Sequence, residues 1–353
     1  MFVYDSHMDA PIDLRWRLAD DDAGQAPLFG EPTPGRRDLP AVEYLHVRSR
    51  RVISAVPPTS RMPFRYTVNP YRGCAHACTY CFARPTHAYL GMNGGEDFER
   101  RIVVKVNAVE ALRAELRDPR WGGDHVALGT NTDPYQPAEG RYRLTRGICE
   151  ALAEAGNPFS ILTKSSMIRR DIDVLAPAAA AGLFRAALSI GTVDDEVARC
   201  SEPGAAPPSA RLETLARLVE AGIPTGVLIA PILPGISDAP DQLEAVVRAC
   251  VDAGASSITP IVLHLRPGVR ELFEPWLEDV RPDLRERYAR LYHRASGYAP
   301  EHQTRIAAQV QALCDEAGLV PRPATFRLAT PRSTAPVLGA RWAVEQLALD
   351  LAG

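Results

Sequence analysis

Hydrophobic residues in this chain gather in short runs, separated by stretches in which apolar positions recur with helical spacing. Six of the runs are apolar on both faces, and they cover residues 65–69, 125–129, 159–165, 184–190, 224–233 and 257–265. A shorter run lies at residues 102–106. Because strands that are buried on both faces belong to parallel sheets with helical crossovers, the pattern predicts repeated βα units.

The predicted helices lie between and after these runs, and Pro or Gly marks several of their ends. Pro208 opens one helix that Gly222 closes, and Gly182 and Gly254 end two others. After a short helix that ends near Leu90, they cover residues 108–116, 144–155, 171–181, 208–221, 242–253, 269–279, 282–295, 301–317 and 340–349. Six βα units are too few to close an eight-stranded barrel. We therefore expect an α/β fold that is a partial, open (β/α)6 barrel of the TIM type.

The chain divides into three predicted parts. Residues 1–60 are rich in Pro, Asp and Arg and have little periodicity, which indicates an extended N-terminal arm. We expect the barrel in residues 61–280 and a C-terminal helical extension in residues 281–353. The Arg-Ser-Arg-Arg run at residues 48–51 is typical of a solvated face, and the alternative is a contact with a polyanion.

Composition narrows the class of protein. The chain has 353 residues, 46% of them hydrophobic and 24% charged, and a net charge of −3, so it has no overall attraction to nucleic acid or membranes. No apolar run is long enough to cross a bilayer and no positively charged signal precedes one, so we expect a cytoplasmic protein without a membrane partner. Seven cysteines, an odd and low number, argue against a disulfide framework.

Three of the cysteines follow the first predicted strand on one short loop. From Asn69 the sequence reads Asn-Pro-Tyr-Arg-Gly-Cys-Ala-His-Ala-Cys-Thr-Tyr-Cys-Phe, which gives the spacing C-x3-C-x2-C. Three thiolates can hold a [4Fe-4S] cluster and leave one iron open to an outside ligand. The predicted metal ligands are Cys74, Cys78 and Cys81. The alternative is a zinc ion that these cysteines bind together with His76 or His87.

Polar residues follow the predicted strands at the points where the strands end. Because the carboxyl ends of parallel strands meet at one side of a barrel, we expect these residues near the cysteine loop. They are residues 130–133, Lys164 with Ser165, Ser189, and Ser237 with Asp238. Of the 40 Lys and Arg residues only Lys105 and Lys164 are lysine, which makes both candidates for positions that require a compact ammonium group.

Four motifs resemble the radical SAM superfamily, in a branch related to spore photoproduct lyase. They are Tyr-Thr-Val-Asn-Pro-Tyr-Arg-Gly-Cys at residues 66–74, Cys-Phe-Ala-Arg-Pro-Thr-His at 81–87, Asn-Thr-Asp-Pro-Tyr-Gln-Pro at 131–137, and Lys164 in Thr-Lys-Ser-Ser. The resemblance covers about residues 49–265. It implies a partial barrel and an enzyme with two cofactors, a [4Fe-4S] cluster and S-adenosylmethionine (SAM). It also implies reductive cleavage of SAM to a 5′-deoxyadenosyl radical, with an external one-electron reductant of the flavodoxin or ferredoxin type.

The resemblance implies roles for individual residues in SAM binding. Thr132 and Asp133 lie beside the amino-acid moiety, Lys164 approaches the methionine carboxylate, and Ser189 approaches the ribose. Residues 229–236 pass the adenine. Tyr80 and Asn131 complete the expected cofactor-binding set. Alternatives remain: Asp133 is also suited to a turn before Pro134, Ser189 to a helix cap, Lys164 to the surface, and residues 229–236 to a plain core strand.

Three functions follow from these patterns. The first is a radical SAM enzyme of unknown substrate, the second a nucleic-acid repair or modification enzyme of the same fold, and the third a non-enzymatic, zinc-stabilised binding protein. We expect the chain not to be a spore photoproduct lyase, because residues 126–137 contain no cysteine as hydrogen donor and Phe82 replaces a tyrosine. Tyr135 is then the candidate catalytic residue, and Cys149 is a second substitute for the missing donor.

Overall fold

The computed structural model of the chain describes residues 42–57, 60, 62–293, 297 and 299–319, together with the backbone of the short strand β1 (Trp16–Leu18). The helix predicted at residues 340–349 and most of the first 41 residues lie outside this range.

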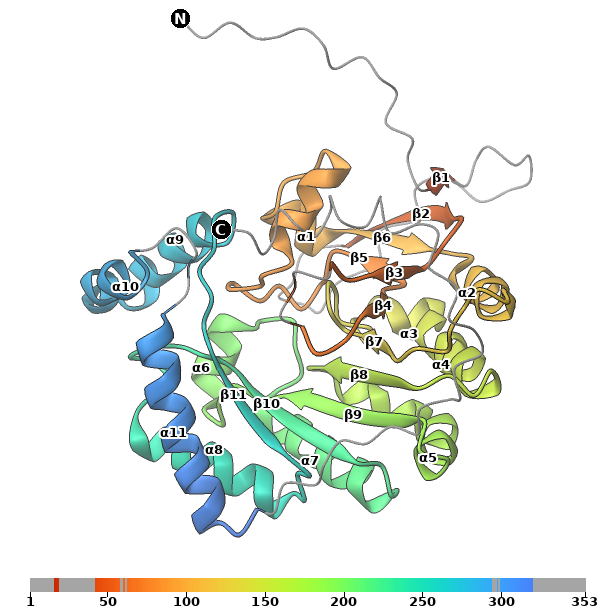
Figure 1. The fold of residues 1–353 in the computed structure, drawn as a ribbon. Coiled ribbons are helices and arrows are strands. Elements are labelled where there is room, and N and C mark those ends of the chain that lie inside the picture. Colours follow the sequence, from red (N-terminus) through yellow and green to blue (C-terminus); the bar gives the residue numbers. More distant parts are fainter. Residues whose placement is uncertain are drawn as a thin grey trace, which may run out of the picture.

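A seven-stranded sheet forms the body of the molecule (Figure 1), in the order β11-β10-β9-β8-β7-β4-β3. Six of its strands are parallel and follow one another in chain order. They are β4 (Tyr66–Val68), β7 (Val126–Leu128), β8 (Phe159–Thr163), β9 (Phe184–Ser189), β10 (Thr225–Ile232) and β11 (Ile258–Val262). The antiparallel strand β3 (Ile53–Ala55) pairs with β4 at one edge. The predicted partial (β/α)6 barrel is confirmed.

Helices cover the outer face of the sheet. They are α2 (Ala108–Arg117), α4 (Leu144–Glu154), α5 (Ile172–Ala180), α7 (Pro208–Glu220) and α8 (Pro240–Asp252). Their apolar faces pack on the strands, where Ile148 and Leu152 of α4 share a core with Leu128, Phe159 and Ile161. Burial of each such side chain contributes roughly 1.5–3 kcal/mol, which explains why the apolar runs predicted these elements well.

Several short elements were not predicted from the sequence. They are α1 (Glu96–Arg100), α3 (Ala138–Tyr142), α6 (Asp195–Ser201) and the 3-10 segment η3 (Ser166–Asp171). The short helix predicted to end near Leu90 is present as the 3-10 segment η2 (Arg84–Leu90). Each of the three α-helices is two turns or shorter, so apolar residues cannot recur often enough to show a period.

A second, four-stranded sheet lies beside the barrel, in the order β1-β2-β6-β5. It contains β2 (Glu43–Ser49), β5 (Tyr71–Arg72) and β6 (Arg101–Lys105). The predicted arm therefore contributes strands to both sheets, and the apolar run at residues 102–106 belongs to the second sheet rather than the barrel. Since β5 leads directly into the cysteine loop, this sheet fixes where the loop begins.

Helices α9 (Arg270–Val280), α10 (Arg285–Leu291) and α11 (Pro300–Glu316), with the 3-10 turn η4 (Pro282–Leu284), end the described chain. Ile306 and Val310 of α11 share a core with Val262 of β11 and Val246 of α8. One continuous core thus extends across the expected boundary at residue 280. In the part of the chain that the structure describes, no helix has the length and apolar character to span a bilayer.

Candidate active site

The cysteine loop, residues 73–82, lies at the carboxyl ends of the barrel strands. Cys74 and Cys78 are buried and Cys81 is partly exposed. Burial raises the pKa of all three thiols, and that of Cys78 reaches about 12. The charge of Asp133, and after it the charges of Cys78 and Cys81, raise the pKa of Cys74 further. The loop starts at Gly73, whose φ of +79° suits glycine and whose Cβ would lie 2.7 Å from the Phe98 carbonyl oxygen.

Two side chains after β7 hold the start of the loop. The Thr132 hydroxyl donates to the Gly73 carbonyl oxygen at 2.6 Å. The amide of Gln136 donates to the same oxygen at 3.0 Å, and its own oxygen accepts from the Ala75 N–H at 3.1 Å. On the other side, buried Arg84 donates twice to the Cys78 carbonyl, at 2.9 and 2.7 Å. The backbone around all three cysteines is therefore fixed by hydrogen bonds.

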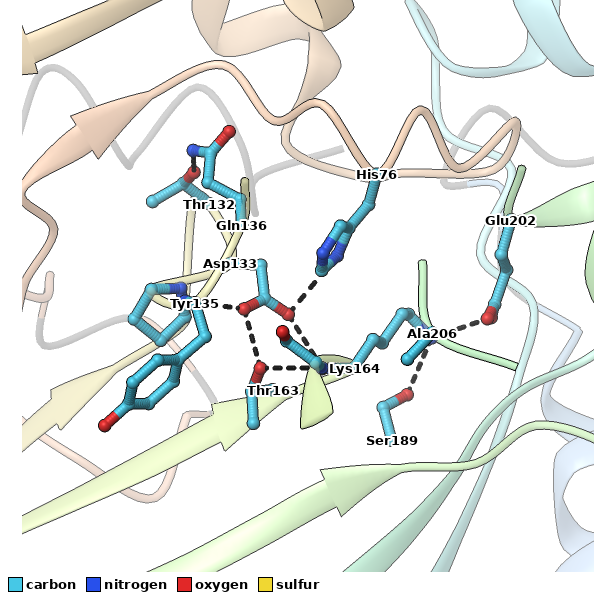
Figure 2. Close-up of polar contacts among 12 residues, drawn as sticks. His76, Thr132, Asp133, Tyr135, Gln136, Thr163, Lys164, Ser189, Glu202 and Ala206 are labelled. Atoms are coloured by element: carbon cyan, nitrogen blue, oxygen red, sulfur yellow. Dashed lines mark hydrogen bonds and ion pairs between the residues drawn. The ribbon is translucent and has the colours of Figure 1, made fainter. Parts of the chain in front are cut away.

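Asp133 joins the ends of β7 and β8 (Figure 2). Its carboxylate accepts from the Thr163 hydroxyl at 2.6 Å, from the Lys164 N–H at 2.7 Å and from the Tyr135 N–H at 2.9 Å. The His76 ring nitrogen lies 3.5 Å from one oxygen. Both carboxylate oxygens thus have protein donors, so Asp133 serves the turn that one interpretation of the sequence predicted, and it also positions the loop.

Lys164 connects the ends of three strands. Its ammonium donates to the Ser189 hydroxyl at 2.8 Å, to Glu202 at 2.8 Å and to the Ala230 carbonyl at 3.1 Å. It also lies 5.5 Å from the centre of the Tyr80 ring. An ammonium group has three N–H donors, so every donor of Lys164 has an acceptor within the protein.

Glu202, directly after α6, was missed from the sequence. It is buried, and its carboxylate accepts from Lys164, Arg211 and the Tyr80 hydroxyl. Burial alone would raise the pKa of Glu202, but the charges of Lys164 and Arg211 outweigh it and lower that pKa to about 2. Glu202 is therefore ionised at neutral pH. No signal marked it, because it follows a short helix instead of a strand end.

The segment around Glu202 packs directly on the cysteine loop. The Thr79 N–H donates to the Ser201 carbonyl at 3.0 Å, and the Gly204 N–H donates to the His76 carbonyl at 3.0 Å. A Cβ at Gly204 would lie 2.1 Å from the Ala75 carbonyl oxygen. Residues 201–206, which we call the cover segment, thus approach the loop backbone more closely than any side chain would allow.

The remaining predicted site residues divide into two groups. The structure brings Tyr80, Thr132, Lys164 and Ser189 to the cysteine loop, with Asp133. Asn131 contributes its N–H, which donates to the Asn69 side chain at 3.3 Å. Tyr135 points away from this group (Figure 2), and its hydroxyl donates to Asp171 at 3.0 Å in the core. The structure therefore does not place the candidate catalytic tyrosine at the site, and Cys149 is buried in the same core.

The donor set fits an iron–sulfur cluster better than a zinc ion. His76 is engaged by Asp133, whereas His87 has a contact for one ring nitrogen, Nε2, which lies 3.2 Å from the Arg101 carbonyl, and its buried Nδ1 has no hydrogen-bond partner among the described residues. Among the residues that the structure describes, no three His, Cys, Asp or Glu side chains are close enough together to hold a single metal ion. A [4Fe-4S] cluster requires a wider spacing between the sulfur atoms of its cysteines than a single ion does, because each thiolate binds a different iron.

Comparison with known proteins agrees with this geometry. The family model described as "Radical SAM superfamily" matches residues 68–250, from the end of β4 to α8 and more than half of the chain. The chain belongs to the radical SAM superfamily. It is therefore an enzyme whose cofactors are a [4Fe-4S] cluster and SAM.

Two further proteins are similar to this chain over different lengths. An uncharacterised protein of Mycobacterium tuberculosis is 42% identical over 84% of each chain. A protein described as "Radical SAM Nalpha-GlyT isomerase" of Pseudomonas phage M6 is 29% identical over 47% of this chain and 33% of its own.

Solved structures of spore photoproduct lyase share the fold. One variant has a TM-score of 0.57 at 16% identity and covers 77% of this chain and 79% of its own. Another, with bound AdoMet and dinucleoside spore photoproduct, has a TM-score of 0.54 at 18% identity over 73% and 75%. These similarities support the partial radical SAM barrel.

Proposed function

We propose that this protein holds a [4Fe-4S] cluster through Cys74, Cys78 and Cys81 and binds SAM between the cysteine loop and Lys164, in order to start a radical reaction on a substrate other than the spore photoproduct. One observation carries the proposal: Lys164, whose side chain is 14% exposed, stands at the strand ends with its ammonium 5.5 Å from the centre of the Tyr80 ring in the cysteine loop. Its charge partly offsets the burial that raises the pKa of Cys78 and Cys81.

Held by Cys74, Cys78 and Cys81, a [4Fe-4S] cluster would supply the electron for reductive cleavage of SAM, and SAM would supply the radical chemistry on the substrate. The protein binds and orients. Lys164 serves the methionine carboxylate, Ser189 the ribose, and residues 229–236 the adenine. Thr132, Gln136 and Arg84 hold the loop backbone so that the three thiols keep their positions.

Two further parts of the proposal concern the electron donor and the cellular compartment. The electron comes from an external one-electron reductant of the flavodoxin or ferredoxin type, and the protein acts in the cytoplasm. Composition supports the cytoplasm, since an odd and low number of cysteines, three of them on one loop, does not suit a disulfide framework.

The substrate differs from that of spore photoproduct lyase. Thr130 stands where a hydrogen-donating cysteine is expected, and its hydroxyl lies 2.6 Å from that of Thr67. An O–H bond is too strong to quench a carbon radical as a thiol does. Phe82 is 50% exposed and has no hydrogen to transfer. Tyr135 and Cys149, the possible substitutes, are both buried in the core.

A nucleic-acid substrate is the second candidate. The exposed Phe82 ring at the rim of the cysteine loop has the Arg266 guanidinium 6.0 Å from its centre. Aromatic rings next to arginine are a common platform for unpaired bases. Binding of single-stranded oligonucleotides that weakens steeply with salt, and weakens again in Phe82→Ala, would support this candidate. Salt-independent or absent binding would remove it.

The test is direct. Reduced, anaerobically reconstituted protein should release 5′-deoxyadenosine from SAM slowly without a substrate, and no release under these conditions would contradict the proposal. Incubation with the dinucleotide spore photoproduct should give no thymidylyl-thymidine. Multiple-turnover recovery of that product would show that the enzyme is a lyase after all.

A further inference from the structure

Two cations share one carboxylate behind the cysteine loop. Lys164 and Arg211 both contact Glu202, and the side chains of these three residues are only 14%, 3% and 6% exposed. Asp133 accepts from the Thr163 hydroxyl and from backbone N–H groups and not from the Lys164 ammonium. Within the Lys164–Glu202–Arg211 group, two cations therefore share one carboxylate as their ionic partner. A buried cation is costly unless a partner of opposite charge stays with it.

Lys164 has no spare donor for such a partner. Its three N–H groups face Ser189, Glu202 and the Ala230 carbonyl. An incoming carboxylate must replace one of these acceptors, and Glu202 is the only charged one among them. Replacement of Glu202 exchanges one carboxylate for another, so Lys164 keeps an ionic partner throughout.

Glu202 keeps its own partners after such an exchange. Arg211 is held independently of Lys164, because it also donates to the Ala206 carbonyl at 2.6 Å and to the Ser189 carbonyl at 3.0 Å. The Tyr80 hydroxyl donates to Glu202 as well. Lys164 can move because its ammonium sits on a flexible four-carbon chain, whereas the guanidinium of Arg211 is fixed. After the exchange, Lys164 and Glu202 therefore both still have a partner of opposite charge.

We propose that Glu202 is a built-in competitor for Lys164: it occupies the ammonium in the SAM-free protein, and the carboxylate of the incoming amino-acid moiety displaces it onto Arg211 and Tyr80. This inference rests on the proposed SAM site and deepens it. Glu202 thereby lowers the affinity for SAM and makes Lys164 available only to ligands that bring a carboxylate of their own. A residue that merely braces the fold would have the opposite effect on affinity.

The experiment is calorimetric titration of anaerobically reconstituted holoenzyme with SAM. Glu202→Gln keeps the shape of the side chain and removes its charge, so Lys164 no longer has to leave an anion. We expect Kd for SAM to fall about five- to tenfold, as when one charge-assisted contact no longer has to be broken. The EPR signal of the reduced cluster should show a larger SAM-bound fraction at the same subsaturating concentration.

Three further variants complete the test. Glu202→Asp withdraws the carboxylate from Lys164 and should also bind SAM more tightly. Glu213→Gln is the matched control, an exposed carboxylate of α7 paired with Arg169, and should change nothing. In a Lys164→Met background, adding Glu202→Gln should leave Kd unchanged, because the competition no longer exists.

The outcomes separate the two proposals. If the wild-type holoenzyme does not bind SAM, the proposed function fails and this inference fails with it. If the wild type binds SAM but Glu202→Gln binds it equally or more weakly, only the inference is overturned. Loss of the cluster in both Glu202 variants would assign Glu202 to the fold and overturn the inference too.

Discussion

Among the described residues, two buried ionic networks at the barrel make a useful comparison, because one lies at the candidate site and the other does not. The Lys164–Glu202–Arg211 group stands beside the cysteine loop. The second network lies between α3, α4 and η3, where Glu139 and Asp171 are fully buried. Tyr71 donates to Glu139 at 2.5 Å, Arg146 donates to Asp171 at 3.2 Å, and Arg170 contacts both carboxylates.

The two networks differ in charge balance and in surroundings. In the second, Arg146 and Arg170 meet Glu139 and Asp171, and Arg146 also pairs with Asp173 and Glu150, so carboxylates outnumber cations. In the first, two cations share one carboxylate, and the lysine acts on the thiols of the cysteine loop. Burial of ionic groups alone therefore does not identify a functional site, because structural networks are buried as well. The features that distinguish the candidate site are its excess of cations over carboxylates and its place at the carboxyl ends of barrel strands.

The largest effect should come from the thiols of the cysteine loop, which stands beside the first network. Cys78→Ala should abolish the brown colour and the binding of about four irons per chain, because one thiolate of three is lost. Cys250→Ala is the matched control, a buried thiol in the core beside α11, and should keep its iron. Iron and sulfide analysis after anaerobic reconstitution measures both, and full iron loading in Cys78→Ala would contradict the assignment.

A change in the second network should affect the fold without affecting the cofactor. Asp171→Asn leaves Arg170 and Arg146 short of a buried counter-charge, and we expect a loss of about 3–5 kcal/mol in the free energy of unfolding. Kd for SAM, measured on the folded fraction, should not change. A clear shift in Kd would show that the two networks are not separate.

Replacement of Lys164 tests whether the first network contributes to SAM binding. Lys164→Met should weaken SAM binding by about 1.5–3 kcal/mol through the loss of a charge-assisted contact. The same substitution at Lys105, whose buried ammonium donates to the Asn69 carbonyl at 2.7 Å, should weaken it much less. Equal effects of the two substitutions on Kd would remove Lys164 from the proposed site.

The cover segment should show the smallest effect. Gly204→Ala places a methyl group against the Ala75 carbonyl and should destabilise the protein by about 1–3 kcal/mol and loosen cluster retention. Gly140→Ala, whose Cβ would lie 3.7 Å from the Met167 methyl group, is the control. Thermal unfolding and iron loss on dilution into chelator measure the two variants. Identical behaviour would show that the cover segment adapts freely.

The sequence could predict what is local. Apolar runs located the six parallel strands, and the spacing of three cysteines located the cysteine loop. The rule that chemistry gathers at strand ends also selected Lys164 and Ser189, which the structure places within hydrogen-bond distance of each other. Each of these features depends on residues that are close together in the chain, so the sequence alone contains the pattern that identifies it.

What the sequence could not predict depends on packing between distant segments. Glu202 and Arg211 meet Lys164 only because α6, a helix of seven residues, returns the chain to the cysteine loop. Gln136 lies in the motif at residues 131–137, but its contact with the backbone of the cysteine loop arises only from the tertiary structure. Tyr135 was expected nearby, yet its N–H donates to Asp133 in a turn that directs its ring into the core.

The central claim is that the three-cysteine loop and the Lys164 group form one SAM-binding site at an iron–sulfur cluster. Mössbauer spectroscopy of protein reconstituted with ⁵⁷Fe, with and without SAM, tests it most directly. We predict that SAM changes the signal of about one iron in four, the one without a protein thiolate. Four equivalent irons whose Mössbauer signal does not change with SAM, or a protein that takes up zinc in place of iron, would contradict the account.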